Sequence, residues 1–124
     1  MGELKTYEGS CHCGGVQFSF RSLLIEDAMR CNCSVCRRKN AIMSRARFSD
    51  EAFTIINDET LAVYQFEPNM VNHFYCSRCG IYPFHNDVES TNSYRVNLCC
   101  VDEIEPHELD IKVFDGRDTW KFLD

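Results

Sequence analysis

The sequence predicts a mainly β protein, and three observations lead to that fold class. Apolar residues make up 44% of the 124 residues, and Gly (6) and Pro (3) are scarce, which argues against disorder. Short segments of alternating apolar and polar residues recur along the chain, and turn-prone residues separate them. We see no internal repeat, low-complexity segment or linker, so residues 1–124 are expected to form one domain.

The N-terminal half is expected to contain several short strands and two helical turns. Val16, Phe18 and Phe20 alternate with polar residues, which is typical of a half-buried strand. Ser49 is a good N-cap for a helical turn before Phe53. The strands are expected at residues 4–8, 16–21, 28–31 and 41–48, and a short helical turn at 34–39.

The C-terminal half continues the same pattern. The turn-prone residues 57–59 and 68–69 separate strand-like runs. We expect Trp120, Phe122 and Leu123 to pack back on the last strand. The strands are expected at residues 54–57, 61–66, 71–75, 81–85, 94–101 and 109–114.

Charge and cysteine content narrow the function classes. A net charge of −6 disfavours nucleic acid as a partner, because binding to phosphates needs Lys and Arg. The first residues include no apolar run, and no segment has the length of a membrane span, so we expect no membrane association and a cytoplasmic location. Nine cysteines are far more than average usage, and an odd number cannot all pair in disulfides within one chain. We therefore expect reduced thiols that bind metal.

Three of these thiols lie close together as Cys31-x-Cys33-x-x-Cys36, the three-cysteine cluster. One tight loop can turn all three sulfurs onto a zinc ion, which binds thiolates at about 2.3 Å. A structural zinc normally has four protein ligands, whereas three leave a position for water or substrate. This cluster therefore predicts a zinc site with an open position.

Four other thiols form a complete ligand set, the four-cysteine cluster. Cys11-x-Cys13 lies among glycines, and Cys76-x-x-Cys79 is followed by Gly80, which accepts a left-handed turn. Together these two motifs can hold a closed structural zinc that joins distant parts of the chain. We therefore expect two zinc ions.

Other readings of these residues stay open. A histidine or another cysteine could complete the three-cysteine cluster and make it purely structural, and an iron–sulfur cluster is a weaker option because the spacing follows neither ferredoxin run. Cys99 and Cys100 lie in an expected strand, point to opposite faces and are expected to be core or half-buried thiols. Arg37, Arg38 and Lys39 form either a solvated face or an anion site. The candidate fourth ligands are His12, His73, His85, Cys99 and Cys100.

The ordered motifs resemble a known family. Residues 11–14 read Cys-His-Cys-Gly, residues 31–37 Cys-Asn-Cys-Ser-Val-Cys-Arg and residues 76–80 Cys-Ser-Arg-Cys-Gly; residues 96–102 and 114–117 look like the closing strands. The order is similar to that of the glutathione-dependent formaldehyde-activating enzyme family, also called the GFA or CENP-V family.

The resemblance covers roughly residues 7–118 and implies a β-tent of short antiparallel sheets with two zinc ions. It implies that Cys11, Cys13, Cys76 and Cys79 hold the structural zinc and that Cys31, Cys33 and Cys36 hold the catalytic one. Asn40 stands where similar members tend to have glycine, and asparagine also accepts a positive φ.

The chemistry that suits three thiolates on zinc is the making or breaking of a carbon–sulfur bond. Such a site already carries a charge of −1, so it acidifies water poorly but can keep a substrate thiolate nucleophilic. We expect a zinc-dependent carbon–sulfur lyase that acts on a glutathione-like thiol adduct of a small aldehyde. Arg37, Arg38 and Lys39 would attract a carboxylated thiol to the site. The general acid would be a bound water or His85. The alternatives are a noncatalytic zinc-stabilised module that binds a protein and a thiol switch.

Overall fold

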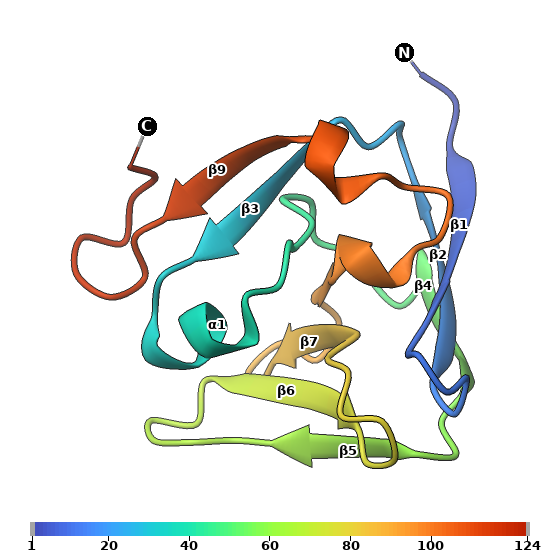
Figure 1. Ribbon diagram of the computed structural model, residues 1–124, viewed down its shortest axis with the longest axis horizontal. Coiled ribbons are helices and arrows are strands. Elements are labelled where there is room, and N and C mark those ends of the chain that lie inside the picture. Colours follow the sequence, from blue (N-terminus) through green and yellow to red (C-terminus); the bar gives the residue numbers. More distant parts are fainter. Residues whose placement is uncertain (1, 124) are drawn as a thin grey trace.

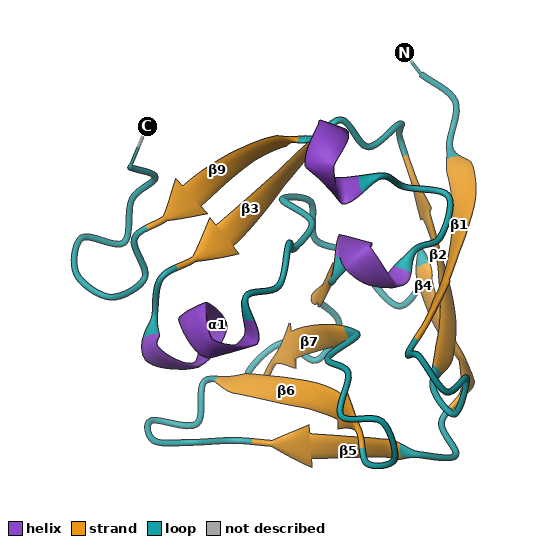
Figure 2. Cartoon of the chain, viewed as in Figure 1, coloured by secondary structure: helices purple, strands orange, loops and turns teal. Residues whose placement is uncertain are grey.

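Three small β-sheets stand around a common core in the computed structural model, which describes residues 2–123 (Figure 1). One sheet forms the right side of the view, a second the base, and the pair β3 and β9 the upper left. Helical segments are short and lie between the sheets (Figure 2). The elements are β1 (Lys5–Ser10), β2 (Gln17–Ser22), β3 (Asp27–Cys31), α1 (Ser34–Lys39), β4 (Phe53–Asn57), β5 (Leu61–Tyr64), β6 (Val71–Cys76), β7 (Phe84–Asp87), β8 (Tyr94–Val96), the 3₁₀ helices Leu98–Cys100 and Pro106–Glu108, and β9 (Asp110–Phe114).

The sheets confirm the predicted fold class, mainly β with short antiparallel sheets. Strands β1, β2 and β4 pair antiparallel in that order, and β5, β6, β7 and β8 form a second antiparallel sheet. The third sheet differs, because β3 and β9 pair parallel, with Asp27 opposite Asp110 and Cys31 opposite Phe114. The end of the chain therefore runs beside the segment that enters the three-cysteine cluster.

Aromatic rings connect the two antiparallel sheets. Phe18 and Phe20 are 0% and 1% exposed, which confirms the predicted buried face of β2. Phe53 on β4 packs edge to face against Phe84 on β7, with 5.0 Å between ring centroids, and stacks on Tyr94 at 4.1 Å. Burial of aromatic rings contributes a large share of core energy, so these contacts hold the two sheets together.

The helical turn predicted at residues 34–39 is confirmed as α1. It ends at Asn40, which has φ 52° and ψ 38°, the left-handed geometry that asparagine tolerates. Residues 49–53 form a single turn, in which the N–H groups of Ala52 and Phe53 donate to the Ser49 carbonyl. No helix within residues 2–123 is long and apolar enough to cross a bilayer.

The strand predicted at residues 41–48 is wrong as a continuous element. Met43 makes isolated bridges to Met29 and Asn97, and Phe48 makes one to Tyr94. The segment therefore passes between two sheets and pairs briefly with each. Ile42, Met43 and Phe48 are buried, but the segment pairs with two partners in turn and forms no continuous ladder with either.

The strand predicted at residues 94–101 ends early, at Val96. The Asn97 side chain then accepts a hydrogen bond from the Cys99 N–H at 3.1 Å and caps a 3₁₀ helix. Cys99 consequently lies exposed and Cys100 buried, so only Cys100 is a core thiol. The strand predicted at 81–85 is displaced and forms β7 instead.

The C-terminal segment packs back on β9 only in part. The Phe122 ring packs edge to face on Phe114, with 5.4 Å between centroids. Leu123 donates its N–H to the Val113 carbonyl at 2.9 Å, but its side chain remains 61% exposed. The predicted packing is therefore confirmed for the aromatic ring and wrong for the leucine side chain.

Candidate metal centres and cavity

The four-cysteine cluster has the geometry of a tetrahedral metal site. One ligand atom from each of its four cysteines lies within 4.8 Å of all the others. The sulfur of Cys13 lies 3.7 Å from that of Cys11 and 3.5 Å from that of Cys76. Four sulfurs at about 2.3 Å from one zinc ion would lie about 3.8 Å apart, so this donor set fits zinc.

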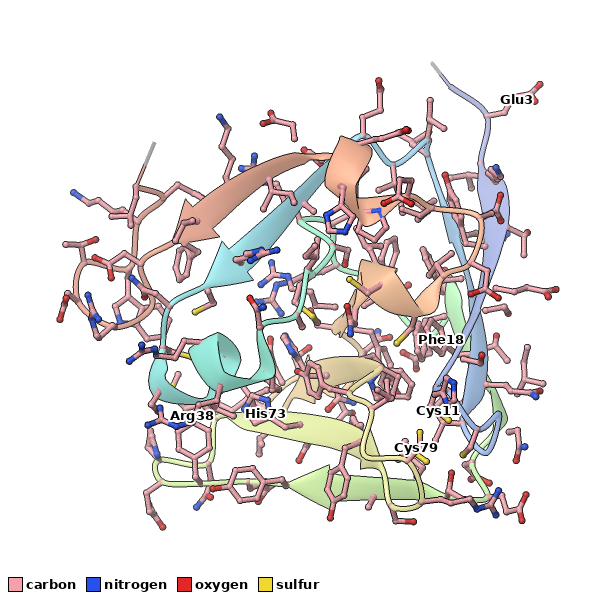
Figure 3. All side chains as sticks on the ribbon, in the orientation of Figure 1. Glu3, Cys11, Phe18, Arg38, His73 and Cys79 are labelled. Atoms are coloured by element: carbon pink, nitrogen blue, oxygen red, sulfur yellow. The ribbon has the colours of Figure 1, made fainter. Side chains whose placement is uncertain are left out.

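Backbone and hydroxyl groups surround one sulfur of this cluster. The N–H groups of Arg78 and Cys79 point to the Cys76 sulfur at 3.4 and 3.3 Å, and the Thr60 hydroxyl lies 3.1 Å from it. Gly80 completes the turn with φ 78°. Donors of this kind favour a thiolate, the form that binds metal. Figure 3 shows Cys11 and Cys79 facing each other where the β1–β2–β4 sheet meets the β5–β8 sheet.

The three-cysteine cluster forms where β3 leads into α1. Cys31 is the last residue of β3, Cys33 precedes α1, and Cys36 lies within it. Their sulfurs lie within 4.8 Å of one another, which suits one metal ion. Within residues 2–123, no fourth His, Cys, Asp or Glu has a ligand atom in this group.

The five residues considered as fourth ligands therefore lie elsewhere. His12 and Cys99 are exposed, whereas Cys100 is buried. Burial raises the pKa of Cys100 to about 12, so it stays a neutral core thiol. His73 and His85 are buried in a different group, described below. The fourth position of the three-cysteine cluster is left without a protein donor in the described chain.

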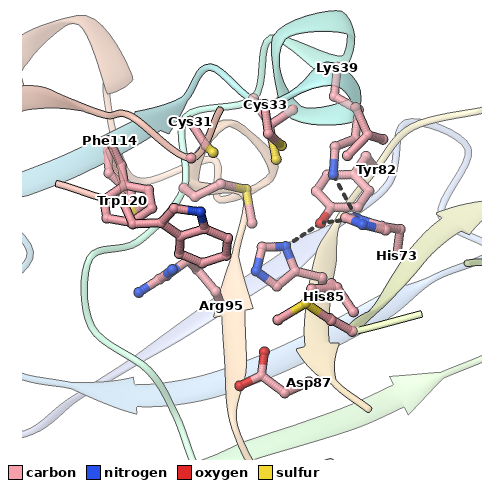
Figure 4. A pocket seen from close by; sticks show the side chains of 18 of the residues that line it. Cys31, Cys33, Lys39, His73, Tyr82, His85, Asp87, Arg95, Phe114 and Trp120 are labelled. Atoms are coloured by element: carbon pink, nitrogen blue, oxygen red, sulfur yellow. Dashed lines mark hydrogen bonds between the residues drawn. The ribbon is translucent and has the colours of Figure 1, made fainter. Parts of the chain in front are cut away.

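A cavity of about 570 Å³ opens beside the three-cysteine cluster. This volume lies within the range of sites that enclose a small organic ligand. Figure 4 shows Phe114 and Trp120 on the side near Cys31, and Lys39, His73 and Tyr82 across from them. The lining side chains come from α1, the β3–β9 pair, the β5–β8 sheet with its connections, residues 41–47 and the C-terminal segment. They include Cys31, Cys33, Cys36, Lys39, Met43, Arg47, Phe66, Met70, His73, Tyr82, His85, Asp87, Arg95, Phe114, Trp120 and Phe122.

Of the basic run, only Lys39 lines this cavity. Arg37 and Arg38 are exposed, and Arg38 donates to the Ser34 carbonyl at 2.8 Å. The Lys39 Nζ lies 3.4 Å from the centroid of the Tyr82 ring. Burial lowers the pKa of Lys39 to about 8, although the neighbouring cysteines act in the opposite direction.

Two histidines and a tyrosine form a buried polar group beside Lys39. The Lys39 Nζ lies 2.9 Å from His73 Nδ1, and the Tyr82 hydroxyl contacts Nδ1 of both His73 and His85. Burial lowers the pKa of His73 to about 4 and that of His85 well below its ordinary value. Burial also raises the pKa of Tyr82, so near pH 7 all three groups are neutral.

Sequence reasoning missed the arginines of the cavity. Arg47 pairs with Asp87 at 3.0 Å, whereas Arg95 donates to the Arg45 carbonyl at 3.3 Å. Both arginines lie far from any motif in the sequence and reach the cavity through the antiparallel pairing around β8. The alternation of β8, in which Arg95 lies between Tyr94 and Val96, gave no sign of a ligand.

Comparison with known proteins gives a family match over most of the chain. The family model described as glutathione-dependent formaldehyde-activating enzyme matches residues 6–117. The chain belongs to this family. All seven cysteines of the two clusters fall within the matched GFA region.

Two similar proteins extend the comparison. A curated Halomonas elongata protein, whose name provisionally assigns it as a glutathione-dependent formaldehyde-activating enzyme, is 37% identical over 81 residues. The match covers 59% of this GFA-family chain and 51% of the relative, so the chain spans about half the length of that protein. The crystal structure of a Rhodobacter sphaeroides protein matches with a TM-score of 0.70 and 33% identity, over 84% of this chain and 98% of the other.

Proposed function

We propose that this protein is a zinc-dependent carbon–sulfur lyase that acts on a glutathione-like thiol adduct of a small aldehyde. One observation carries the proposal. The three-cysteine cluster has no fourth protein donor in the described chain, and it lies at the wall of a 570 Å³ cavity. A ligand set with three members and an adjoining cavity is the arrangement that a catalytic zinc site requires.

The two clusters would then divide the metal roles. Cys11, Cys13, Cys76 and Cys79 would hold a structural ion, because four thiolates close the coordination shell. A zinc ion held by the three-cysteine cluster would keep the sulfur of a bound thiol deprotonated and electron-rich. The nine free cysteines suit a reducing compartment, and we place the activity in the cytoplasm.

Cleavage of the adduct breaks one carbon–sulfur bond and needs one proton acceptor. The hydroxyl proton of the adduct leaves, its oxygen becomes the aldehyde carbonyl, and the sulfur keeps the bonding electron pair as thiolate. Lys39 lines the cavity, and a pKa of about 8 gives it both protonation states near neutrality. We assign Lys39 as the base in cleavage and as the acid in the reverse direction, in place of His85.

The neutral pair His73 and Tyr82 would hold Lys39 in position. His73 Nδ1 can accept a hydrogen bond from the Lys39 ammonium at 2.9 Å, and the Tyr82 ring lies below it. The ammonium also contributes positive charge to the cavity, which favours a carboxylated thiol. Arg37 and Arg38 can assist only through the longer-range field, since both lie outside the cavity.

Cobalt substitution tests the open position directly. With cobalt in both clusters, added millimolar glutathione or cysteine should change the sulfur-to-metal absorption of the three-cysteine cluster. The change should disappear in Cys33→Ser and persist in Cys99→Ser, whose thiol belongs to neither cluster. A spectrum that no small thiol alters would mean that the fourth position is taken, and a noncatalytic protein-binding module would then explain the fold better.

A further inference from the structure

Large apolar side chains gather at the mouth of the cavity although they are accessible to water. Phe66 and Met70 come from the connection between β5 and β6, and Trp120 and Phe122 come from the C-terminal segment. All four are exposed, and Trp120 is the most exposed of them at 63%. An exposed apolar group that rims a cavity is typical of a ligand-binding surface, because its burial by a ligand is favourable.

The backbone holds Trp120 in an unusual conformation at this rim. Its φ is 58°, in the left-handed region that large aromatic residues rarely adopt. The Trp120 N–H donates to the Asp115 carbonyl at 2.7 Å, and its ring meets Phe114 edge to face at 6.0 Å. Such a conformation persists where surrounding contacts fix it, and it is enriched at functional sites.

Asn32 attaches this aromatic segment to the three-cysteine cluster. Its backbone N–H donates to the Phe114 carbonyl at 3.2 Å, and its Nδ2 donates to Asp115 Oδ1 at 2.9 Å. Its Oδ1 accepts from the Arg117 N–H at 3.1 Å. Because Asn32 lies between Cys31 and Cys33, these hydrogen bonds fix the position of the C-terminal aromatic segment relative to the sulfurs of the three-cysteine cluster.

A positive charge without a full set of partners also lines the cavity, on Arg95. The Nε of Arg95 is buried and has no hydrogen-bond partner among the described residues. Burial lowers the pKa of Arg95 to about 10, which still leaves it charged near pH 7. Arg47, in contrast, already pairs with Asp87 at 3.0 Å. Another nitrogen of the same guanidinium already donates to the Arg45 carbonyl. A guanidinium that lines a cavity with one N–H unpaired favours a carboxylate ligand.

We propose that the adduct handled here carries two recognition groups beyond the carbon–sulfur bond. The first is an apolar group about the size of an aromatic ring, on the aldehyde half, that packs against Trp120. The second is a carboxylate, on the thiol half, that pairs with Arg95. This inference rests on the proposed lyase function and names its substrate class: a hydroxymethyl group alone leaves the apolar wall uncovered, whereas a ring-bearing aldehyde covers it.

The cavity can be tested apart from the reaction, because Trp120 is the only tryptophan of the chain. Its fluorescence should respond to phenylacetate, which combines a ring with a carboxylate, and much less to acetate. Arg95→Gln should weaken phenylacetate binding about tenfold, the scale of one charge-assisted hydrogen bond. Equal responses to both acids, or unchanged affinity in Arg95→Gln, would overturn the inference.

The reaction supplies the second measurement. Exchange between free aldehyde and its glutathione adduct, followed by NMR with the zinc-loaded protein, should be faster for phenylacetaldehyde than for formaldehyde relative to each uncatalysed rate. Trp120→Ala should reduce the preference for phenylacetaldehyde over formaldehyde about tenfold, since stacking and burial of a ring contribute on that scale. Leu123→Ala is the matched control, an exposed apolar residue of the same segment that does not line the cavity.

The outcomes separate the two proposals. Turnover of the formaldehyde adduct with no gain for phenylacetaldehyde, or an equal loss in Leu123→Ala, overturns the substrate class and leaves the lyase function standing. No turnover of any adduct, with selective phenylacetate binding intact, overturns the lyase function and supports the ligand class of the cavity.

Discussion

Replacing one cysteine in each cluster should have very unequal effects on stability. Cys76→Ser removes a fully buried ligand that receives the Thr60 hydroxyl and two backbone N–H groups. Cys36→Ser removes a half-buried ligand in α1, from a cluster whose three cysteines are close in sequence. We expect the first variant to lose its folded state and the second to keep it.

The difference can be estimated from the segments that each ion would join. Cys13 and Cys76 are 63 residues apart in sequence, whereas Cys31 and Cys36 are five apart. The entropy of loop closure grows as the logarithm of this separation, so the longer loop is worth about 2 kcal/mol more. Binding of a structural zinc contributes about 10–16 kcal/mol in small domains, against a total stability of about 5–15 kcal/mol.

Metal analysis combined with thermal melts checks this prediction. The wild type should contain two zinc ions, and Cys36→Ser should contain one and melt within about 10 °C of it, which corresponds to a loss of about 2 kcal/mol. Cys76→Ser should show no cooperative melt. Cys99→Ser, an exposed thiol outside both clusters, serves as the control. Equal collapse of Cys76→Ser and Cys36→Ser, or one zinc ion in the wild type, would refute the division of roles.

Three further variants test the cavity and its supports. Burial lowers the pKa of Lys39 to about 8, so the cleavage rate should rise with pH through about 8 as Lys39 becomes neutral. Lys39→Met should flatten this pH profile and reduce the rate about 100-fold, whereas the control variant Arg38→Ala should change neither. A hydrogen bond from Asn32 lowers the pKa of Asp115 from 3.8 to about 2. The ionised Asp115 carboxylate therefore stabilises the fold fully above pH 3.8, and this stabilisation is lost as the pH falls through 2. The melting temperature of Asp115→Asn should not show this pH dependence in acid. In Gly116→Ala the added Cβ would lie 2.6 Å from the Cys31 sulfur, so metal analysis should show loss of that ion alone.

Cysteine spacing predicted each metal-binding motif, because the ligands of one motif are close in sequence, and counting ligands then joined the two motifs that are 63 residues apart. Cys11-x-Cys13, Cys76-x-x-Cys79 and the three-cysteine motif each fit within one turn, so spacing alone limits which sulfurs can meet. The same reasoning identified the helical turn of α1 and its end at Asn40. The motifs and the helical turn depend on contacts between residues that are close in sequence, so the sequence alone can predict them.

The cavity could not be predicted in the same way, because it is built from side chains that meet only through tertiary pairing. Lys39 reaches Tyr82 from the end of α1, and Trp120 reaches the cluster because β9 pairs parallel with β3. The basic run did not act as a unit: Arg37 and Arg38, which directly precede Lys39 in the same helix, are exposed and do not line the cavity. A run of basic residues shows how much charge a segment carries, but the orientation of the helix determines which of those residues faces the cavity.

The proposed division between the clusters would also explain how a short chain can keep a reactive position open. An incompletely ligated metal contributes less to folding than a closed one, so the fold needs another source of order at the same place. Asn32 supplies it, since its backbone and side chain bond the C-terminal segment to the loop between Cys31 and Cys33. The four-cysteine cluster meanwhile joins the β1–β2–β4 sheet to the β5–β8 sheet. The ligands that would stabilise the fold and the ligands that would perform the chemistry are therefore separate, and only the first set needs to be complete.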